Sequence, residues 1–162
     1  MISLRRATKD ERAPLENLIQ LYSYDWSELR PSDVAENGRF DDYPLDAYWQ
    51  EEWRHPFLLR VDSKLAGFAL ISTRSHLTGA SGVSDVAELF VMRRYRRRGV
   101  GRAAASAAFD QFKGSWEVRQ RDENVEATAF WRRVIAEYTG GKYQEVHWND
   151  ATWTGPVQSF SV

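Results

Sequence analysis

The chain has 162 residues, of which 43% are hydrophobic and 28% are charged, and its formal net charge is -1. This length suits one ordinary domain with a sizeable core, so we expect a single domain over residues 1–162. The balanced charge gives no overall attraction to nucleic acid or to a membrane surface, so any charge-based function must be local. The absence of cysteine excludes disulfides, thiolate metal ligands and cysteine nucleophiles.

Neither a targeting segment nor a metal site is indicated by the sequence. The N-terminal residues MISLRRATKDERAPLENL lack the apolar stretch of a signal peptide, and no other run approaches the length of a membrane span. We therefore expect a cytoplasmic protein with no membrane partner. The histidines His55, His76 and His147 are isolated and lack ligand spacing, so no metal is expected.

The N-terminal third predicts a strand, a helix and a covering segment. Residues Ile2–Arg6 alternate between apolar and polar, and apolar residues recur at helical spacing from Leu15 to Tyr22. The aromatic and acidic segment from Tyr24 to Trp53 is broken by prolines and a glycine, with a helix expected over Leu45–Trp53. We expect this segment to cover one side of the fold.

The middle of the chain predicts a hairpin and a buried strand. Two β-rich runs, Phe57–Val61 and Leu65–Ile71, flank a turn at Asp62–Lys64. A loop rich in Ser, Thr and Gly is expected over Ser72–Ser84, and it leads into the apolar run Val86–Val91. That run is typical of a strand buried on both faces.

The C-terminal part predicts two helices and three strands. The Ala-rich run Arg102–Phe109 favours a helix, and an amphipathic pattern predicts another over Glu126–Tyr138. Strands are expected at Trp116–Gln120, at Tyr143–Trp148 and at Ala151–Phe160, with the last two forming a β pair.

The turn from Arg96 to Gly101, between the buried strand and the Ala-rich helix, has the pattern Arg/Gln-x-x-Gly-x-Gly/Ala. A glycine-rich turn at a helix start binds phosphate because unpaired amide groups and the helix dipole meet there, and glycines leave the approach open. Gly99-x-Gly101-x-x-Ala104 also fits a dinucleotide-binding motif formally, but the arginines and the paired strands at both ends disfavour a parallel nucleotide fold.

In this context the segment from Val86 to Ala108 resembles the coenzyme A motif of the GNAT superfamily of N-acyltransferases. A second block, Asn124–Trp131, resembles the superfamily's downstream Asn-x-x-Ala-x-x-Phe-Tyr helix. The sequence segments YRRRGVGR and FWRRVI resemble those of a subset of the superfamily that is described as predicted acetyltransferases. The resemblance implies an α/β (α+β) fold with a mixed, mainly antiparallel sheet, splayed after the strand ending near Val91, and helices on both faces.

The resemblance implies acetyl-CoA as cosubstrate and N-acetyl transfer to a primary amine as the reaction. The backbone of the turn would bind the pyrophosphate, assisted by arginine charge, and the strand end would polarise the thioester. Asn124 would bind pantetheine or simply cap its helix. The expected acetyl-CoA contacts are Phe90, Val91, Met92, Arg96, Arg97, Arg98, Gly99, Val100, Gly101, Arg102 and Asn124. The arginines could instead bind nucleic acid, but the glycines and helix start favour a compact pyrophosphate, so no nucleic-acid partner is expected.

Direct transfer needs a group that takes a proton from the ammonium and one that protonates the thiolate. Glu88 is the preferred base because it is a carboxylate in an apolar strand, where burial raises its pKa. Asp85 is the alternative base, and either carboxylate could instead pair with an arginine. Trp131 replaces the superfamily's tyrosine and cannot donate a proton, which leaves Tyr138 or water as the acid. The replacement of the tyrosine by Trp131 also leaves open the alternative that the protein is a catalytically silent acyl-CoA-binding module.

The segment from Lys9 to Trp53 holds more acidic than basic residues, which favours a cationic acceptor, although an acidic solvated face would look the same. A small-molecule or peptide amine is therefore expected as the partner, and a homodimer is compatible with the resemblance. The expected acceptor contacts are Tyr22, Asp25, Trp26 and Trp49.

Overall fold

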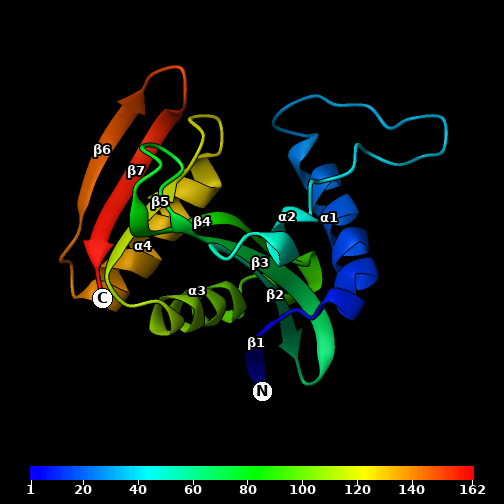
Figure 1. Cartoon of the computed structure of the whole chain (residues 1–162), viewed down its shortest axis with the longest axis horizontal. Coiled ribbons are helices and arrows are strands. Elements are labelled where there is room, and N and C mark those ends of the chain that lie inside the picture. Colours follow the sequence, from blue (N-terminus) through cyan, green and yellow to red (C-terminus); the bar gives the residue numbers. More distant parts are fainter.

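The structure is a computed structural model that describes residues 1–162. One sheet of seven strands runs through it in the order β1-β2-β3-β4-β5-β7-β6 (Figure 1). The strands are β1 (Ile2–Arg6), β2 (Arg54–Val61), β3 (Lys64–Arg74), β4 (Ser81–Val91), β5 (Ser115–Arg119), β6 (Gln144–Asn149) and β7 (Thr154–Ser161). All neighbours are antiparallel except β4 and β5, which are parallel. This confirms the predicted mixed, mainly antiparallel sheet.

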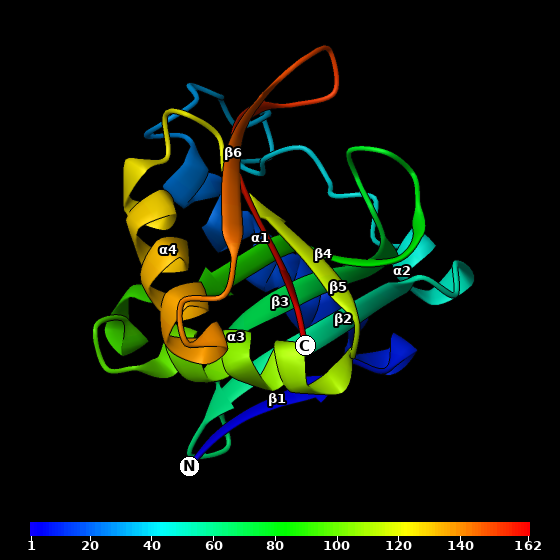
Figure 2. The same ribbon diagram turned by 90° about the vertical axis from the view of Figure 1, so that its left-hand side faces the viewer.

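Helices cover both faces of the sheet, as predicted. They are α1 (Arg12–Trp26), α2 (Ala47–Gln50), α3 (Val100–Gln111) and α4 (Val125–Thr139), with short 3-10 helices η1 (Lys9–Glu11) and η2 (Arg93–Tyr95). In Figure 2, α3 and α4 lie in front of the sheet and α1 lies behind it. None of the helices combines the length and apolar composition that a membrane span requires.

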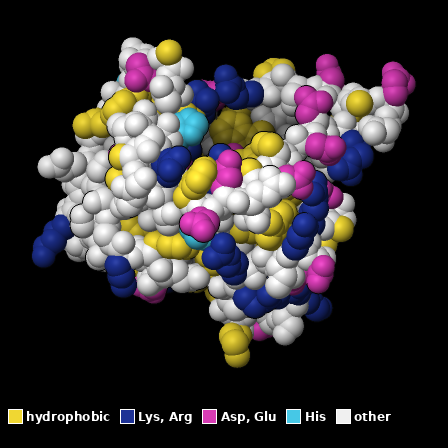
Figure 3. All heavy atoms as spheres, viewed as in Figure 1, with side chains coloured by type: hydrophobic (Ala, Val, Ile, Leu, Met, Phe, Trp, Pro, Cys, Tyr) yellow, Lys and Arg dark blue, Asp and Glu magenta, His cyan; other side chains and the backbone are white.

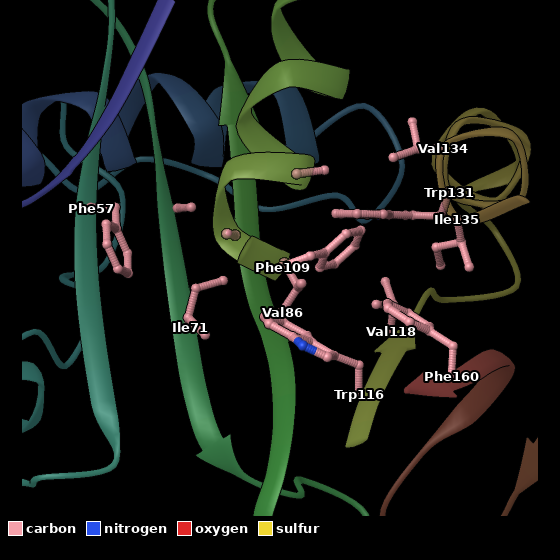
Figure 4. Close-up of a cluster of buried hydrophobic side chains, with 13 residues drawn as sticks. Phe57, Ile71, Val86, Phe109, Trp116, Val118, Trp131, Val134, Ile135 and Phe160 are labelled. Atoms are coloured by element: carbon pink, nitrogen blue, oxygen red, sulfur yellow. The ribbon is translucent and has the colours of Figure 1, made fainter. Parts of the chain in front are cut away.

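The two faces of the central strands build two separate apolar cores. Successive residues of a strand point to opposite faces. Phe57 and Ile71 therefore join the core against α3 and α4 (Figure 4), whereas Leu58 and Leu70 join the core against α1 and α2. The apolar runs that predicted these strands thus reflect burial on both sides.

The sheet forks between β4 and β5. These strands pair only where Val83–Asp85 faces Ser115–Glu117, and β5 follows β7 along its whole length. From Val86 to Val91, β4 stays paired with β3 but has no strand on its other side. The predicted splay is confirmed, and it begins at Val86.

Two predicted boundaries are wrong. The loop expected over Ser72–Ser84 is much shorter, because the β3–β4 ladder continues to the pair Arg74↔Ser81. The helix expected over Leu45–Trp53 spans only Ala47–Gln50, because the chain extends at Glu51 toward the start of β2 at Arg54. The first error arises because the small and polar residues of this segment do not reveal the backbone pairing that decides its structure.

Candidate active site at the fork of the sheet

The turn between β4 and α3 has the backbone geometry of an anion-binding site. Gly99 is the N-cap of α3 with φ of 76°, and Arg97 is also left-handed with φ of 59°. At this helix end the amide of Ala103 donates to the Gly99 carbonyl at 2.9 Å. The amides of residues 100–102 therefore have no acceptor within the helix, and a helix N-terminus favours a negative charge beside them.

Gly101 allows α3 to pass close to α4. A Cβ at this position would lie 3.2 Å from two ring carbons of Phe130. The second glycine of the motif thus serves close helix packing beneath the turn as well as an open approach to it.

The arginines of the turn divide into held and free side chains. Arg96 donates from Nε to the Val91 carbonyl at 2.6 Å and pairs with Asp25 of α1, which also binds Arg93 at 2.9 Å. Asp25, expected at the acceptor, thus ties α1 to the turn. Arg102 lies 3.4 Å from Glu137 on α4. Arg97 and Arg98 are exposed and take part in no ion pair.

The end of β4 offers main-chain groups to the fork. The amide of Met92 donates to the Ala66 carbonyl of β3 at 2.8 Å, and the Phe90 carbonyl also lies against β3, beside Gly67. Because alternate strand residues direct their backbone groups to opposite sides, those of Leu89 and Val91 face the fork. Leu89 was missed by sequence reasoning, since only the strand pairing reveals which residues face this way.

Glu88 lies in the wall of a cavity beside the fork. The cavity has a volume of about 870 Å³, and its wall combines α1, the segment before α2, β4 and the chain after β5. Tyr22 donates a hydrogen bond to Glu88, and the Tyr43 hydroxyl donates to it at 3.3 Å. Burial raises the pKa of Glu88 to about 7, and the Tyr22 hydrogen bond acts in the opposite direction. Glu88 can therefore exchange a proton near neutral pH.

Asp85 occupies the closed part of the same strand and is held differently. Arg119 donates to the two carboxylate oxygens of Asp85 at 2.9 and 2.8 Å. The side chain of Asp85 is only 2% exposed and that of Arg119 only 7%. Burial raises the pKa of Asp85, whereas the charge and hydrogen bonds of Arg119 act in the opposite direction. Between the two expected bases, the geometry favours Glu88 because both oxygens of Asp85 are already bound.

The other expected site residues are divided between the cavity and the core. Tyr22 and Trp26 line the cavity, whereas Trp49 packs in the core and donates from Nε1 to the Ala7 carbonyl at 3.3 Å. Tyr138 donates to Asp110 of α3 at 2.7 Å and does not line the cavity. The structure thus does not bring Tyr138 together with Glu88.

The start of α4 also reaches the cavity. Asn124 lines it and, as the N-cap of α4, accepts a hydrogen bond from the Ala127 amide at 3.2 Å, so the capping interpretation holds. Trp131, at the position of the superfamily's tyrosine, lines the cavity and packs in the core. No phenol from α4 therefore enters this part of the site.

Two residues that hold the carboxylates were missed by sequence reasoning. Tyr43 comes from an irregular segment, and its aromatic ring carries no signal that it reaches β4. Arg119 ends β5, and an arginine that follows an apolar strand usually indicates only a solvated end. A carboxylate at position 85 in an otherwise apolar strand was the available hint that a cation lies opposite.

Comparison with known proteins places this site in a family. The chain matches the model of the acetyltransferase (GNAT) family over residues 16–135. No protein of curated function shows significant sequence similarity to it.

Several solved structures share the fold. An acetyltransferase from Thermus thermophilus has a TM-score of 0.71 at 14% identity, covering 100% of this chain and 97% of that one. The spermidine N-acetyltransferase from Vibrio cholerae, in complex with CoA and spermine, has a TM-score of 0.65 at 10% identity, covering 99% and 95%. The ribosomal-protein-S18-alanine N-acetyltransferase from Escherichia coli has a TM-score of 0.56 at 16% identity, covering 99% and 94%. Because the family match spans most of the chain and the fold agrees, the chain belongs to the GNAT acetyltransferase family and is an acyltransferase.

Proposed function

We propose that the protein transfers the acetyl group of acetyl-CoA directly to a primary amine, with Glu88 as the general base. The observation that carries this proposal is the environment of Glu88, a carboxylate in the cavity wall beside the fork whose pKa burial raises to about 7. A base accepts protons efficiently when its pKa is near the working pH.

GNAT acetyltransferases use acetyl-CoA, and the turn before α3 fits its anionic part. We assign the pyrophosphate to the amides of Val100, Gly101 and Arg102, where Gly99 opens the approach and the helix dipole favours an anion. Arg97 and Arg98 are free to add charge. In our assignment Arg96 acts by holding the turn against β4 and α1.

The pantetheine arm fits the fork. The backbone groups of Leu89 and the N–H of Val91, which face the fork at the end of β4, would contact it from one side, and Asn124 would contact it from the start of α4. Such a main-chain contact supplies hydrogen bonds without a catalytic side chain, in the manner of a strand added to a sheet. The N–H of Val91 is the donor best placed to polarise a carbonyl in the fork.

The bound cosubstrate supplies an activated acetyl group as a thioester. Glu88 takes a proton from the acceptor's ammonium, which frees the nitrogen lone pair to attack the thioester carbonyl carbon. As the new C–N bond forms, the C–S bond breaks. The nitrogen then loses its second proton to water, and water protonates the thiolate. We favour water as this acid because Trp131 has no acidic proton and Tyr138 donates to Asp110 outside the cavity.

The acceptor would enter with its amine as a cation. Glu88 and the carboxylates of Asp33 and Asp41 line the cavity, and Tyr22 and Trp26 supply aromatic surface for the chain of the acceptor. A spermidine N-acetyltransferase among the structures of this fold is consistent with an amine acceptor.

The test combines binding with turnover. Acetyl-CoA should raise the melting temperature by mass action, and thiol release should appear with a panel of primary amines. Glu88→Gln should keep the shift in melting temperature but lower kcat by about a hundredfold, because the amide keeps the shape and cannot accept the proton. Gly101→Leu should abolish the shift, since its side chain would collide with Phe130.

Two outcomes would contradict the proposal. Thiol release by Glu88→Gln at the rate of the unaltered protein would remove Glu88 as the base. A melting shift without thiol release from any amine would instead favour a silent acyl-CoA-binding module.

A further inference from the structure

Beyond Glu88, the cavity wall carries a cluster of arginines. Arg54, Arg74, Arg119 and Arg121 line it from the start of β2, the end of β3 and the end of β5. Burial and the charges of Arg119, Arg121 and Arg54 lower the pKa of His76, which lies among them. In Figure 3 the hollow between the two halves of the molecule has Lys or Arg and His side chains along its left and upper rim. This end of the cavity is therefore electropositive.

Only some of these arginines are neutralised. Arg119 binds Asp85 at 2.8 Å, and Arg54 pairs with Glu51. Arg30, farther along the wall, lies 3.1 Å from Glu123. Arg74 and Arg121 have neither a carboxylate within ion-pair distance nor a side-chain hydrogen bond. Their guanidinium donors remain available to a ligand.

Both free guanidinium groups are held on tryptophan rings. The Cζ of Arg74 lies 4.1 Å from the ring centroid of Trp53, and that of Arg121 lies 3.9 Å from the ring centroid of Trp153. Trp153 is itself fixed, because it is buried and its Nε1 donates to the Gln120 carbonyl at 3.0 Å. Such stacking orients the planar donor fork in advance, which favours binding of carboxylate or phosphate oxygens.

Of the acidic residues in the segment that favoured a cationic acceptor, Asp33 and Asp41 line the cavity wall. Asp25 is neutralised by Arg93 and Arg96 outside the cavity. Glu88 lies with Tyr22 and Tyr43, whereas the free arginines lie at the ends of β3 and β5. The cavity wall therefore carries carboxylates, including the proposed proton acceptor Glu88, and also the unpaired cations Arg74 and Arg121.

We propose that the acetyl acceptor is an amine that also carries a carboxylate or phosphate group, bound by Arg74 and Arg121 while its amino group reaches Glu88. This inference rests on the proposed function and narrows its substrate class. A simple polyamine offers nothing that these arginines can bind, and it would place a further positive charge beside them. An amine with an anionic group could bind Arg74 and Arg121 through the anion and Glu88 through the amino group.

The experiment compares matched acceptors that differ only in the anionic group. The pairs are lysine with cadaverine, 6-aminohexanoate with hexylamine, and phosphoethanolamine with ethanolamine, with spermidine as a polycation. We expect kcat/KM for the preferred anionic member to exceed that of its partner by about ten- to a hundredfold, the scale of hydrogen bonds to charged groups. The carboxylate and phosphate pairs show which anion is recognised.

Variants then locate the effect. Arg74→Gln and Arg121→Gln should each raise KM for the preferred anionic acceptor several-fold and leave KM for its partner without the anionic group unchanged. Arg133→Gln, at an exposed arginine of α4 outside the cavity, is the matched control and should change neither. Equal or faster turnover of spermidine and of the partners without an anionic group would overturn the proposal, as would a preference for anionic acceptors that survives in the Arg74→Gln, Arg121→Gln double variant.

A binding measurement separates this proposal from the proposed function. If no amine is acetylated, calorimetry with 6-acetamidohexanoate and N-hexylacetamide still tests the arginines. Binding of the carboxylate alone, lost in Arg74→Gln and Arg121→Gln, would support the anion site although acetyl transfer had failed. Turnover of amines without any dependence on Arg74 or Arg121 would leave the proposed function standing and refute this one.

Discussion

The strand β4 carries two carboxylates, a fully buried one in the closed part of the sheet and a partly buried one in the open part. Asp85, where β4 and β5 still pair, is bound through both oxygens by Arg119. Glu88, beyond the point where the strands separate, receives only tyrosine hydroxyls. Burial raises the pKa of both carboxyl groups, to about 7 for Glu88, and at Asp85 the charge and hydrogen bonds of Arg119 act against this effect. The comparison indicates that the partner, together with burial, decides whether a carboxylate is held in an ion pair or remains free to exchange a proton.

The largest effect is expected from breaking the ion pair in the closed part. Arg119→Met would leave Asp85 as a buried charge without a partner, and we expect the free energy of unfolding to fall by about 3–5 kcal/mol. Denaturant unfolding at neutral pH measures this loss. Because replacing both members of a buried ion pair is often nearly neutral, Asp85→Leu combined with Arg119→Met should recover most of the stability. A loss in Arg119→Met below about 1 kcal/mol, the range of an exposed pair, would show that the pair is not structural.

Replacing the carboxylate in the open part should raise the free energy of unfolding rather than lower it. Because the pKa of Glu88 is raised from 4.5 to about 7, the folded state holds a proton that the unfolded chain has already released in this interval. The free energy of unfolding contributed by Glu88 therefore falls as the pH rises through this interval. Glu88→Gln removes that titration.

As the pH rises from 4.5 to above 7, we therefore expect the free energy of unfolding of Glu88→Gln to increase by about 1–3 kcal/mol relative to that of the unaltered protein. Unfolding curves at both ends of the interval measure the change. A constant difference in stability between the two proteins would mean that Glu88 titrates normally, and the comparison with Asp85 would then fail.

The same contrast explains what the sequence could predict. The turn to which we assign the pyrophosphate and the helix α3 are encoded by adjacent residues, Arg96–Gly101 and the alanines that follow, so a local pattern sufficed to predict their structure. The position of Glu88 in the strand β4 was predictable because a carboxylate in an apolar run is visible in the sequence alone. The turn, the helix and the strand with its carboxylate are each encoded within a single segment. The order of predicted strands and helices along the chain then matched that of the family.

The surroundings of Glu88 were not predictable in this way. Tyr43 and Arg119 come from segments separated by three strands and two α-helices, and Trp153 and Arg121 meet only because β5 and β7 pair. The extent of the β3–β4 ladder beyond Ile71 depends on pairing with Asp85 and Ser81, which small polar residues do not signal. Side-chain partners across a sheet follow from its register, and register is a property of the whole fold.

The smallest expected effect is a shift in the pKa of Glu88 when either of its two tyrosine partners, Tyr22 or Tyr43, is replaced. Both hydroxyls donate to Glu88, and each hydrogen bond stabilises the charged carboxylate and lowers its pKa against the effect of burial. Tyr22→Phe should therefore raise the pKa of Glu88 further, and the acidic limb of kcat/KM against pH should move upward. Tyr43→Phe should move it in the same direction but less, because its hydrogen bond is long at 3.3 Å and contributes less than that of Tyr22.

The measurement is the pH profile of kcat/KM from below to above pH 7 for both variants, with Glu88→Gln as the control that should lack the limb. Above the limb both phenylalanine variants should approach the rate of the unaltered protein, since the carboxylate is then charged whether or not a phenol binds it. A purely structural role of the tyrosines would lower the rate equally at every pH. If neither variant moves the limb while Glu88→Gln removes it, burial alone sets the pKa of Glu88, and the phenols only fix the orientation of its carboxylate.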